Sequence, residues 1–552
     1  MGFQSQNVPQ LNQESAQALA VRTGSVWPLA SRTPFRFGAW AAALMIRCEV
    51  VGVSVVALGY VLLEVARAAR PLWFDEIFTF QIARLPDLGN VFRAIPADGN
   101  PPLYYLLARI SFRLLGETPF AVRLPSIVAF TAALVATYSF VRRRCGPVFG
   151  MFAMLALSCT AMSIDFGSEA RPYALLAGFT SLTMLSWQAA TEAKRHRVLP
   201  LMGMSLGIAG AIASHHYGVI HVGIPLICGE AVRLFKRRRF DTPLCIAGVA
   251  GLSMLGITLP FATATRRVML DYVKNSASFW AKPKLADLSS YGLFMCVWIL
   301  LVFLALLYLA HAVDSNLSDG QEQSADEEAG PPAHETAAAL GLALLIPFMI
   351  GFTWLTTGYY MDRYAISAAI GIAILIGFAS ARLGRNRRQA MAVAALCAIL
   401  LAGRLYGAGA RQFIALQTGK TQTVGLENEM FLRTVPGKEP IVMASAMEYG
   451  EDWFYAPPSL RERLHYLADL PYAVRQRDFL SELSLTADQP YILPKVDDYR
   501  NFRSTHNRFY VYKVGMPDQE WIMDRFISEG WTLKVVGNSE DTSLYLAQSP
   551  VK

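Results

Sequence analysis

The chain has 552 residues, of which 53% are hydrophobic and 17% are charged, and its mean hydropathy is +0.32. Soluble domains carry about 25% charged residues, so this composition excludes a simple water-soluble enzyme. The net charge of +8 comes from basic residues in loops between apolar runs, which is typical of membrane proteins and gives no reason to expect nucleic-acid binding.

Eleven apolar segments predict a polytopic α-helical membrane protein, because each is near the roughly 20 residues that cross a bilayer. They run at about 48–66, 122–141, 147–164, 173–190, 198–214, 217–234, 243–262, 290–312, 337–357, 364–381 and 389–406. Residues 1–36 are polar and lack the apolar core of a signal peptide. We therefore predict a cytoplasmic N-terminal tail and a first helix that is retained.

Four basic runs fall in alternate loops, on one side of the predicted bundle. They occupy residues 142–144, 194–197, 236–239 and 385–388. Because basic loops stay in the cytoplasm, the chain after residue 406 is predicted to lie outside. The segment 313–336 is acidic and rich in Gly, Ser and Pro, which is typical of a disordered cytoplasmic linker. We expect a multi-pass protein of a bacterial inner membrane.

The hydropathy drops after residue 406, where short apolar runs alternate with helical patterns. Runs at 441–443, 509–512 and 531–536 favour strands, and residues 519–528 favour a helix. This pattern predicts an extracytoplasmic α/β domain over residues 407–552, attached to a membrane module over residues 37–406. The seven cysteines lie in or beside apolar segments without a CxxC pair, so no disulfide framework or zinc site is expected.

The first predicted outer loop, residues 67–121, begins with a pair of carboxylates, Asp75 and Glu76. Aromatic neighbours such as Trp73 and Phe74 would hold this segment against the membrane interface. Charged groups placed there either face water or line a site. A solvated pair remains the alternative on these residues alone.

The same loop continues with Asp98-Gly99-Asn100-Pro101-Pro102-Leu103-Tyr104-Tyr105. Its Gly and Pro residues end one helix, and its tyrosines begin another. Asp98 is thus a third carboxylate near the membrane surface, although a plain turn before a helix explains the segment equally well.

A third motif, Ser168-Glu169-Ala170-Arg171-Pro172-Tyr173, lies at the mouth of a predicted membrane helix. Pro172 suits a helix start, where free amides favour an anion. A simple interfacial anchor is the alternative for Arg171.

Taken in this order and on one side of the membrane, the three motifs resemble those of the GT-C superfamily of integral-membrane glycosyltransferases. The similarity is to the bacterial branch related to protein O-mannosyltransferases, aminoarabinose transferases and rhizobial lipopolysaccharide sugar transferases, and it covers about residues 48–406. The family often has a His immediately before the Pro-Pro pair, where this chain has Asn100. An amide at that position can still donate a hydrogen bond to a phosphate or sugar.

The resemblance implies transfer of a sugar from a polyprenyl-phosphate carrier to an extracytoplasmic acceptor, with inversion. It makes Asp75 the base, with Glu76 and Asp98 as supporting carboxylates that orient the acceptor or a metal. The remaining expected substrate-binding residues are Asn100, Tyr104, Glu169, Arg171, Tyr173, Arg266, Arg267, Lys274, Tyr360 and Arg363. Arginine suits a phosphate because its donors form a fork. Snorkelling to the interface is the alternative for any single basic residue.

His215 and His216 lie near the predicted outer surface and raise the question of a metal. Their spacing to His221 fits neither an HExxH pattern nor an i, i+4 pair, so hydrogen bonding to substrate and a structural role both stay open. The sequence neither requires a divalent metal ion nor names a cofactor.

Two other classes of protein are compatible with this many spans. A secondary transporter or lipid flippase of cell-envelope precursors would carry ionisable groups near the bilayer midplane, whereas here they gather at the outer surface. A non-catalytic scaffold would leave Asp75, Glu76 and Glu169 without a reason to lie at one membrane face. The sugar and the acceptor, whether cell-envelope glycan, glycolipid or protein, are not determined by the sequence.

Overall fold

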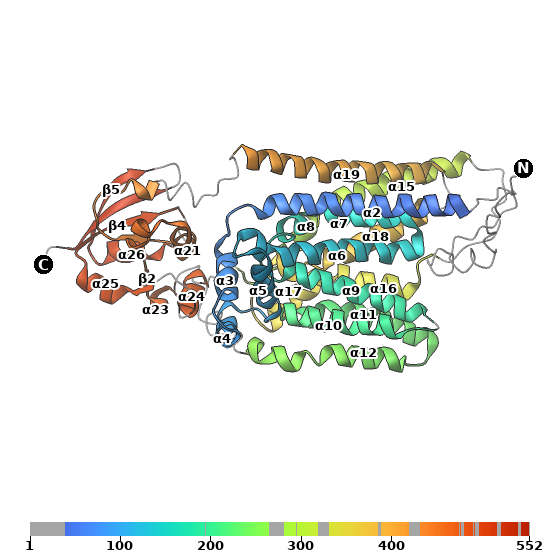
Figure 1. The fold of residues 1–552 in the computed structure, drawn as a ribbon, viewed down its shortest axis with the longest axis horizontal. Coiled ribbons are helices and arrows are strands. Elements are labelled where there is room, and N and C mark those ends of the chain that lie inside the picture. The colour runs from blue at the N-terminus through green and yellow to red at the C-terminus, as the bar shows by residue number, and fades with distance from the viewer. Residues whose placement is uncertain are drawn as a thin grey trace, which may run out of the picture.

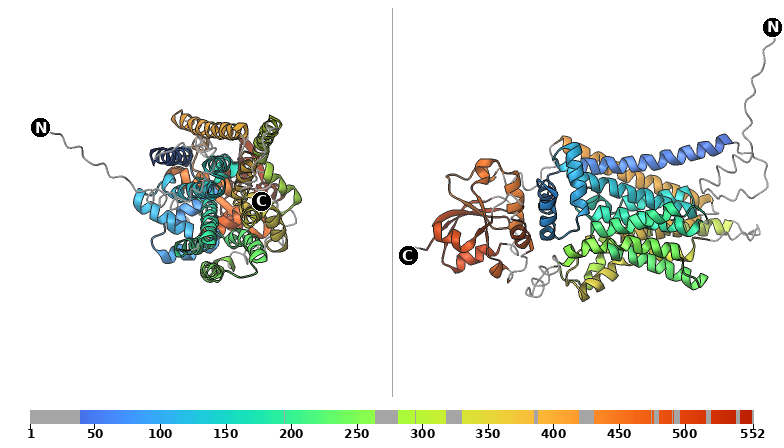
Figure 2. Two further views of the ribbon diagram at one scale, coloured as in Figure 1. Left: turned by 90° about the vertical axis from the view of Figure 1, so that its right-hand side faces the viewer. Right: turned by 60° about the horizontal axis from the view of Figure 1, so that its bottom comes forward.

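A long helical bundle carries a smaller α/β domain at one end of the molecule (Figure 1). The computed structural model describes residues 39–193, 195–263, 281–293, 295–317, 330–384, 388–418, 431–473, 475, 480–489, 491, 496–515, 520–538 and 542–550. Seen end-on in Figure 2, the bundle helices pack side by side and run roughly parallel to one another. The predicted fold class, a helical membrane module followed by an α/β domain, is confirmed.

The bundle is built from helices that differ widely in length. They are α2 (Ala39–Ala68), α6 (Pro119–Cys145), α7 (Pro147–Ser158), α8 (Ala161–Phe166), α9 (Tyr173–Glu192), α10 (Val198–Ser214), α11 (Gly218–Arg237), α12 (Thr242–Leu252), α14 (Ser290–Leu293), α15 (Val297–Leu317), α16 (Ala333–Ala343), α17 (Leu345–Leu355), α18 (Ala368–Gly384) and α19 (Arg388–Gln417). Two short 3₁₀ helices, η1 (Leu285–Ser289) and η2 (Asp362–Ala365), join them. The last helix continues to Gln417, beyond residue 406, where the membrane module was predicted to end.

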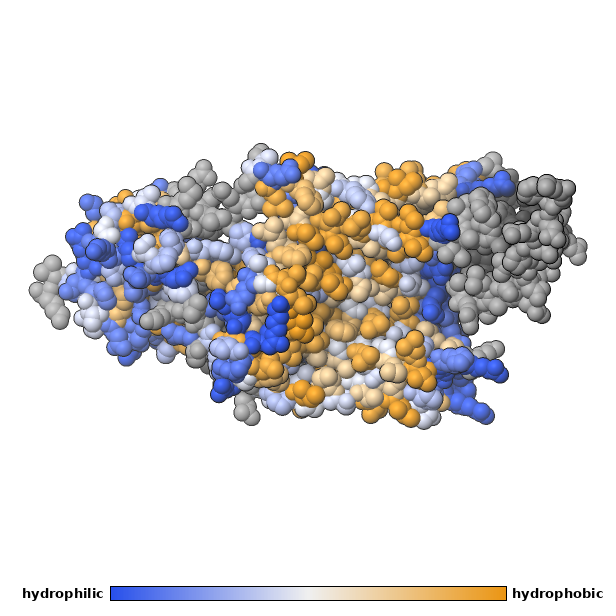
Figure 3. Space-filling view, in the orientation of Figure 1, coloured by the Kyte–Doolittle hydropathy of each residue, from blue (hydrophilic) through white to orange (hydrophobic). Residues whose placement is uncertain are grey.

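Each of the eleven predicted segments contains a helix or a broken helix in the part of the chain that the structure describes. Six helices there are long and apolar enough to cross a membrane, and a seventh span arises if α16 and α17, which meet at a 52° bend, are taken together. Helices α7, α10 and α18 are apolar but shorter. Figure 3 shows an apolar band across the visible face of the bundle, between a hydrophilic α/β domain and a hydrophilic opposite end, as expected for a protein in contact with lipid.

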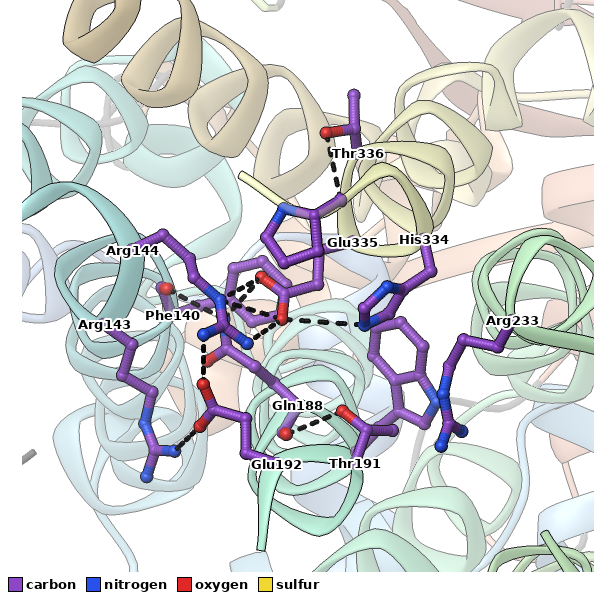
Figure 4. A network of polar contacts seen from close by, with 12 residues as sticks. Phe140, Arg143, Arg144, Gln188, Thr191, Glu192, Arg233, His334, Glu335 and Thr336 are labelled. Carbon is purple, nitrogen blue, oxygen red and sulfur yellow. Dashed lines mark hydrogen bonds and ion pairs between the residues drawn. The ribbon is translucent and has the colours of Figure 1, made fainter. Parts of the chain in front are cut away.

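A network of polar contacts joins α6, α9 and α16 (Figure 4). Glu335, in the first turn of α16, is fully buried and accepts hydrogen bonds from Arg144 Nε at 3.0 and 2.9 Å and from Gln188 Nε2 at 2.9 Å. These donors come from α6 and α9, so one carboxylate joins three helices. A carboxylate is also favoured at the N-terminus of α16 by the helix dipole.

Three short helices cover the other end of the bundle and lie between it and the α/β domain (Figure 1). They are α3 (Phe74–Ala83), α4 (Leu88–Asp98) and α5 (Leu103–Leu115). Asp87 caps α4 by accepting a hydrogen bond from the Asn90 amide at 2.8 Å. Gly99, with φ of 81°, ends α4 in the left-handed conformation that glycine adopts at low cost. The predicted break between Asp98 and the tyrosines is therefore present.

The α/β domain contains a mixed six-stranded sheet in its described residues, with the order β3-β2-β1-β4-β6-β5. The strands are β1 (Ile441–Met443), β2 (Leu464–Ala468), β3 (Val496–Asp498), β4 (Arg508–Lys513), β5 (Thr532–Asn538) and β6 (Ser543–Gln548). Strands β1 to β4 are parallel, with Ile441 opposite both Leu464 and Tyr510, whereas β6 is antiparallel to β4 and β5. The accompanying helices are α21 (Ala446–Tyr455), α22 (Pro458–Arg461), α23 (Leu470–Ala473), α24 (Leu480–Asp488), α25 (Tyr499–Thr505) and α26 (Trp521–Ser528).

Candidate active site

The two adjacent carboxylates of α3 have different surroundings. Glu76 is fully buried and accepts hydrogen bonds from Arg123 Nε at 2.8 Å, from the Ala170 amide at 2.7 Å and, more weakly, from the Trp73 amide at 3.3 Å. Arg123 Nη2 forms a further ion pair with it. With its oxygens occupied in this way, Glu76 fixes the start of α3 against α6 and the loop before α9. These contacts are those of a residue that holds α3 in place, and the predicted supporting role of Glu76 toward the acceptor or a metal stays a prediction.

Arg123, near the start of α6, is a residue that the sequence reasoning missed. It is fully buried, and its guanidinium also donates to the backbone carbonyls of Ala68 and Pro71, both at 2.9 Å, and to that of Arg70. The chain between α2 and α3 is thereby tied to α6. The sequence did contain an indication of this role, because a charge within the first turns of an apolar helix is costly unless it is paired.

Asp75 remains accessible, with 22% of its side chain exposed. Its Oδ2 lies 3.9 Å from Arg171 Nε and 3.6 Å from Arg363 Nη2. These distances allow electrostatic attraction but are too long for direct hydrogen bonds. The structure thus places a partly exposed carboxylate near two cations, neither of which forms a direct hydrogen bond to its carboxylate oxygens.

Arg171, in the loop before α9, holds three outer elements together. Its Nη1 donates to both oxygens of Asp98, at 2.9 and 2.8 Å, to the backbone carbonyl of Asp75 at 3.2 Å and to Thr79 Oγ1 at 3.3 Å. Asp98 also accepts from the Tyr105 hydroxyl. The carboxylates Asp98 and Asp75 hold the pKa of Arg171 well above its usual range despite burial, which acts in the opposite direction. Arg171 is therefore a permanent cation at the site.

Arg363, in η2, reaches the same place from a much later segment of the sequence. Its guanidinium lies over the rings of Trp73 and Tyr173, at 6.0 and 5.5 Å from their centroids. Such cation–π contacts hold a guanidinium without occupying its hydrogen-bond donors. Tyr173 begins α9, directly after Pro172, so the predicted helix start and the predicted late arginine meet in one cluster.

Glu169 is a further ionisable residue close to Asp75. Its side chain is buried, and burial raises its pKa to about 8, with the nearby carboxylates Glu76 and Asp75 acting in the same direction and Arg363 opposing them. Below that pH the group is a neutral acid that can donate a hydrogen bond. Glu169 thus differs from Asp98, which forms a direct ion pair with Arg171.

Three buried polar atoms of this cluster have no hydrogen-bond partner in the described part of the chain. They are Arg171 Nε, Arg363 Nε and Glu169 Oε1. Buried polar atoms in native proteins are nearly always satisfied, so each atom without a partner calls for an explanation. Two cationic donors and one acidic group gathered beside Asp75 would be satisfied by a bound polar anion.

The histidines predicted near the site lie at its edge. His215 is buried among aromatic rings, and its Nδ1 accepts a hydrogen bond from the Tyr217 amide at 3.1 Å. Burial lowers the pKa of His216 to about 4, an effect that the Gly99 backbone partly opposes. His221 is fully buried between Ser367 Oγ and the Tyr364 carbonyl, at 2.7 and 2.8 Å. The contacts of His215 and His221 are those of structural groups, while His216 lies beside the Asp98–Gly99 turn.

Of the other predicted binding residues, some are buried and some lie outside the described part of the chain. Tyr104 is buried, and its hydroxyl is engaged by Val122 O and Ser126 Oγ, both at 2.9 Å, so it supports the packing of α5 on α6. Asn100 and Tyr360 are both buried. The three basic residues Arg266, Arg267 and Lys274 lie outside the described residues. Among the residues that are described, no group of three or more His, Cys, Asp or Glu side chains is arranged to hold a metal ion.

Comparison with known proteins finds one partial sequence match and a similar fold. Residues 99–262 match the family model described as dolichyl-phosphate-mannose-protein mannosyltransferase, a segment that includes Glu169 and Arg171. A search of curated protein sequences finds no match. ArnT from Cupriavidus metallidurans has the same fold: its apo crystal structure is 13% identical with a TM-score of 0.56, and its structure bound to undecaprenyl phosphate is 14% identical with a TM-score of 0.54. Both alignments cover 92% of this chain and 98% of the other.

Proposed function

We propose that this chain, a membrane protein of the GT-C superfamily by its fold and its mannosyltransferase-like segment, transfers a sugar from a polyprenyl-phosphate-linked donor to an acceptor outside the cytoplasm. The observation that carries the proposal is the position of Asp75, partly exposed between Arg171 and Arg363. The buried Nε atoms of both arginines have no hydrogen-bond partner among the described residues. A base beside a cationic phosphate site is the minimum that this reaction needs. The predicted sidedness, with basic loops in the cytoplasm, would place the site outside.

The reaction assigns a task to each group. Asp75 takes the proton of the acceptor hydroxyl or amine as that atom forms a bond to the anomeric carbon. The bond from that carbon to the phosphate oxygen breaks on the opposite face, so the configuration inverts. The polyprenyl phosphate leaves as a stable anion that needs no proton, and Arg171 and Arg363 balance its charge. No strong acid is required, in contrast to glycoside hydrolysis, where an alkoxide must be protonated.

The donor class is supported by the likeness to ArnT, which has been crystallised with undecaprenyl phosphate. That protein aligns over nearly the whole of both chains, so a lipid-phosphate carrier is the natural first candidate for this chain. The acceptor is proposed only as a nucleophile of the cell envelope, on a glycan, glycolipid or protein.

Replacing Arg171 by Gln tests the donor site. A charge-assisted hydrogen bond contributes about 1.5–3 kcal/mol, so we expect the Kd for undecaprenyl phosphate and the KM for the donor to rise about 10- to 100-fold. The assay uses purified full-length protein in nanodiscs and a panel of radiolabelled polyprenyl-phosphate sugars. Arg93→Gln is the matched control, because Arg93 is exposed on the neighbouring helix α4.

The same assay tests the proposed function as a whole. Consumption of a donor by the wild-type protein, weakened by the change at Arg171 but not at Arg93, supports a transferase. If the wild-type protein neither binds nor consumes any donor, the proposal is wrong, and transport of an envelope precursor becomes the next function to test.

Glu169 predicts a particular pH dependence of donor binding. Its pKa of about 8 lies above the ordinary value, so the carboxyl is neutral below that pH and becomes an anion as the pH rises through it. An anion there repels the phosphate, and we expect the affinity for undecaprenyl phosphate to fall several-fold between pH 7 and 9. In Glu169→Gln the side chain stays neutral, so this fall should be absent. An identical fall in both proteins would show that another group titrates.

A further inference from the structure

The α/β domain packs tightly against the helix that carries Asp75. Phe74 and Phe78 of α3 are buried in the same apolar cluster as Tyr449 and Tyr466 of the α/β domain. Phe80 of α3 also meets Phe454, with ring centroids 5.7 Å apart and nearly perpendicular. In Figure 1, α21 stands directly beside α3. The α/β domain and α3, which carries Asp75, therefore share one apolar core.

Polar contacts fix the start of α3 to the same helix of the α/β domain. Glu451 Oε1 accepts a hydrogen bond from the Phe74 amide at 2.8 Å, and the Tyr455 hydroxyl accepts one from the Leu72 amide at 2.6 Å. The first amides of a helix have no partner within the helix and need an acceptor from elsewhere. Trp73, at the N-cap position, offers no side-chain acceptor. A carboxylate 377 residues away in the sequence takes that place.

The fit between the two helices leaves no spare room at Gly450. A Cβ atom added there would lie 2.9 Å from the ring of Phe74, which is closer than side chains tolerate. The Phe74 ring is itself held by Phe78, at 4.8 Å. A side chain at position 450 would therefore push α21 and α3 apart.

We propose that the α/β domain positions the catalytic base, with Glu451 acting from outside the bundle as the acceptor that caps the first amide of α3. Phe74, whose amide Glu451 holds, directly precedes Asp75, so the cap fixes the first turn of α3 and the direction in which Asp75 points. Because Glu451 accepts its hydrogen bond from Phe74 and not from Asp75, it is a positioning residue. The catalytic part of this inference rests on the proposed transferase function, whereas the structural part does not.

Hydrogen exchange tests the cap without any substrate. In Glu451→Ala, peptides covering residues 72–83 of the full-length protein in nanodiscs should exchange about 5- to 10-fold faster than in the wild-type protein, the effect of losing about 1 kcal/mol of hydrogen bonding. Glu451→Gln keeps an acceptor oxygen and should restore slow exchange. This rescue is expected because burial raises the pKa of Glu451 to about 7, so the uncharged form is already abundant near neutral pH. Glu462→Ala, on an exposed residue of the same domain, is the control.

Kinetics test the positioning role. Misplacing a reacting group by about 1 Å can cost about 100-fold in rate, so Glu451→Ala and the wedge Gly450→Leu should lower kcat about 10- to 100-fold. The KM for the donor should change much less than kcat, because Asp98 still holds Arg171 and Tyr173 still contacts Arg363. Glu451→Gln should retain most of the wild-type kcat.

Each outcome is decisive. Unchanged exchange of residues 72–83 in Glu451→Ala overturns the cap. Faster exchange with unchanged kcat overturns the positioning role. If no donor is consumed by the wild-type protein, the proposed function fails, while the exchange measurement still decides whether Glu451 holds α3.

Discussion

Replacing Asp75 by Asn is expected to abolish sugar transfer while leaving donor binding intact. An amide has nearly the same shape as the carboxylate but cannot take the acceptor's proton, and a positioned base contributes about 100- to 10,000-fold in rate. Asp75 also places a negative charge 3.6 Å from Arg363 Nη2. Removing that charge leaves the cations free for phosphate, so the Kd for undecaprenyl phosphate should stay unchanged or decrease. Initial rates and lipid-phosphate binding are measured on the same preparation.

Glu117→Gln is the control for this prediction, because Glu117 is an exposed acid in the same outer segment. It should have wild-type rates. Full activity in Asp75→Asn would place the base elsewhere and remove the central assignment of the site. Loss of lipid-phosphate binding together with activity would instead show that Asp75 maintains the fold of the cluster.

Asp75, Asp98, Glu169, Arg171 and Arg363 were singled out in four separate segments of the sequence. The structure brings them close together, while their roles in a reaction stay predictions. The helix starts at Leu103 and Tyr173 also follow from local chemistry, because Gly and Pro act on the backbone near them. These helix starts could be predicted because the residues that determine them are neighbours in the sequence.

Partners chosen by tertiary packing could not be predicted in this way. Asp75 and Glu76 are equivalent in sequence, yet successive residues of a helix point about 100° apart, so one faces the cations and the other faces α6. Which one is buried depends on Arg123, which lies 47 residues from Glu76. Glu451 is further still from its partner, Phe74. A single sequence contains no pattern that links such residues, because their contact is decided only when the elements dock.

Replacing Arg123 by Met is expected to cause the largest loss of stability among these variants. Glu76 would stay buried without its counter-charge, and the carbonyls of Ala68 and Pro71 would lose their donors. Breaking a buried ion pair by removing one partner costs about 3–5 kcal/mol. A large fall in apparent Tm in nanodiscs is the expected result, and α3 should lose its alignment, so activity should fall as well. Arg113→Met, on an exposed arginine of α5, is the control.

The double variant Arg123→Met with Glu76→Gln separates the charge from the packing. If the main cost is an uncompensated buried charge, neutralising Glu76 should recover part of the Tm that Arg123→Met loses, although the backbone carbonyls remain without donors. If the double variant is no more stable than the single one, the carbonyl contacts of Arg123 carry the stability and its charge does not. A wild-type Tm in Arg123→Met would contradict both explanations, and the start of α3 would then have to be held mainly from the other side, by Glu451 and Tyr455.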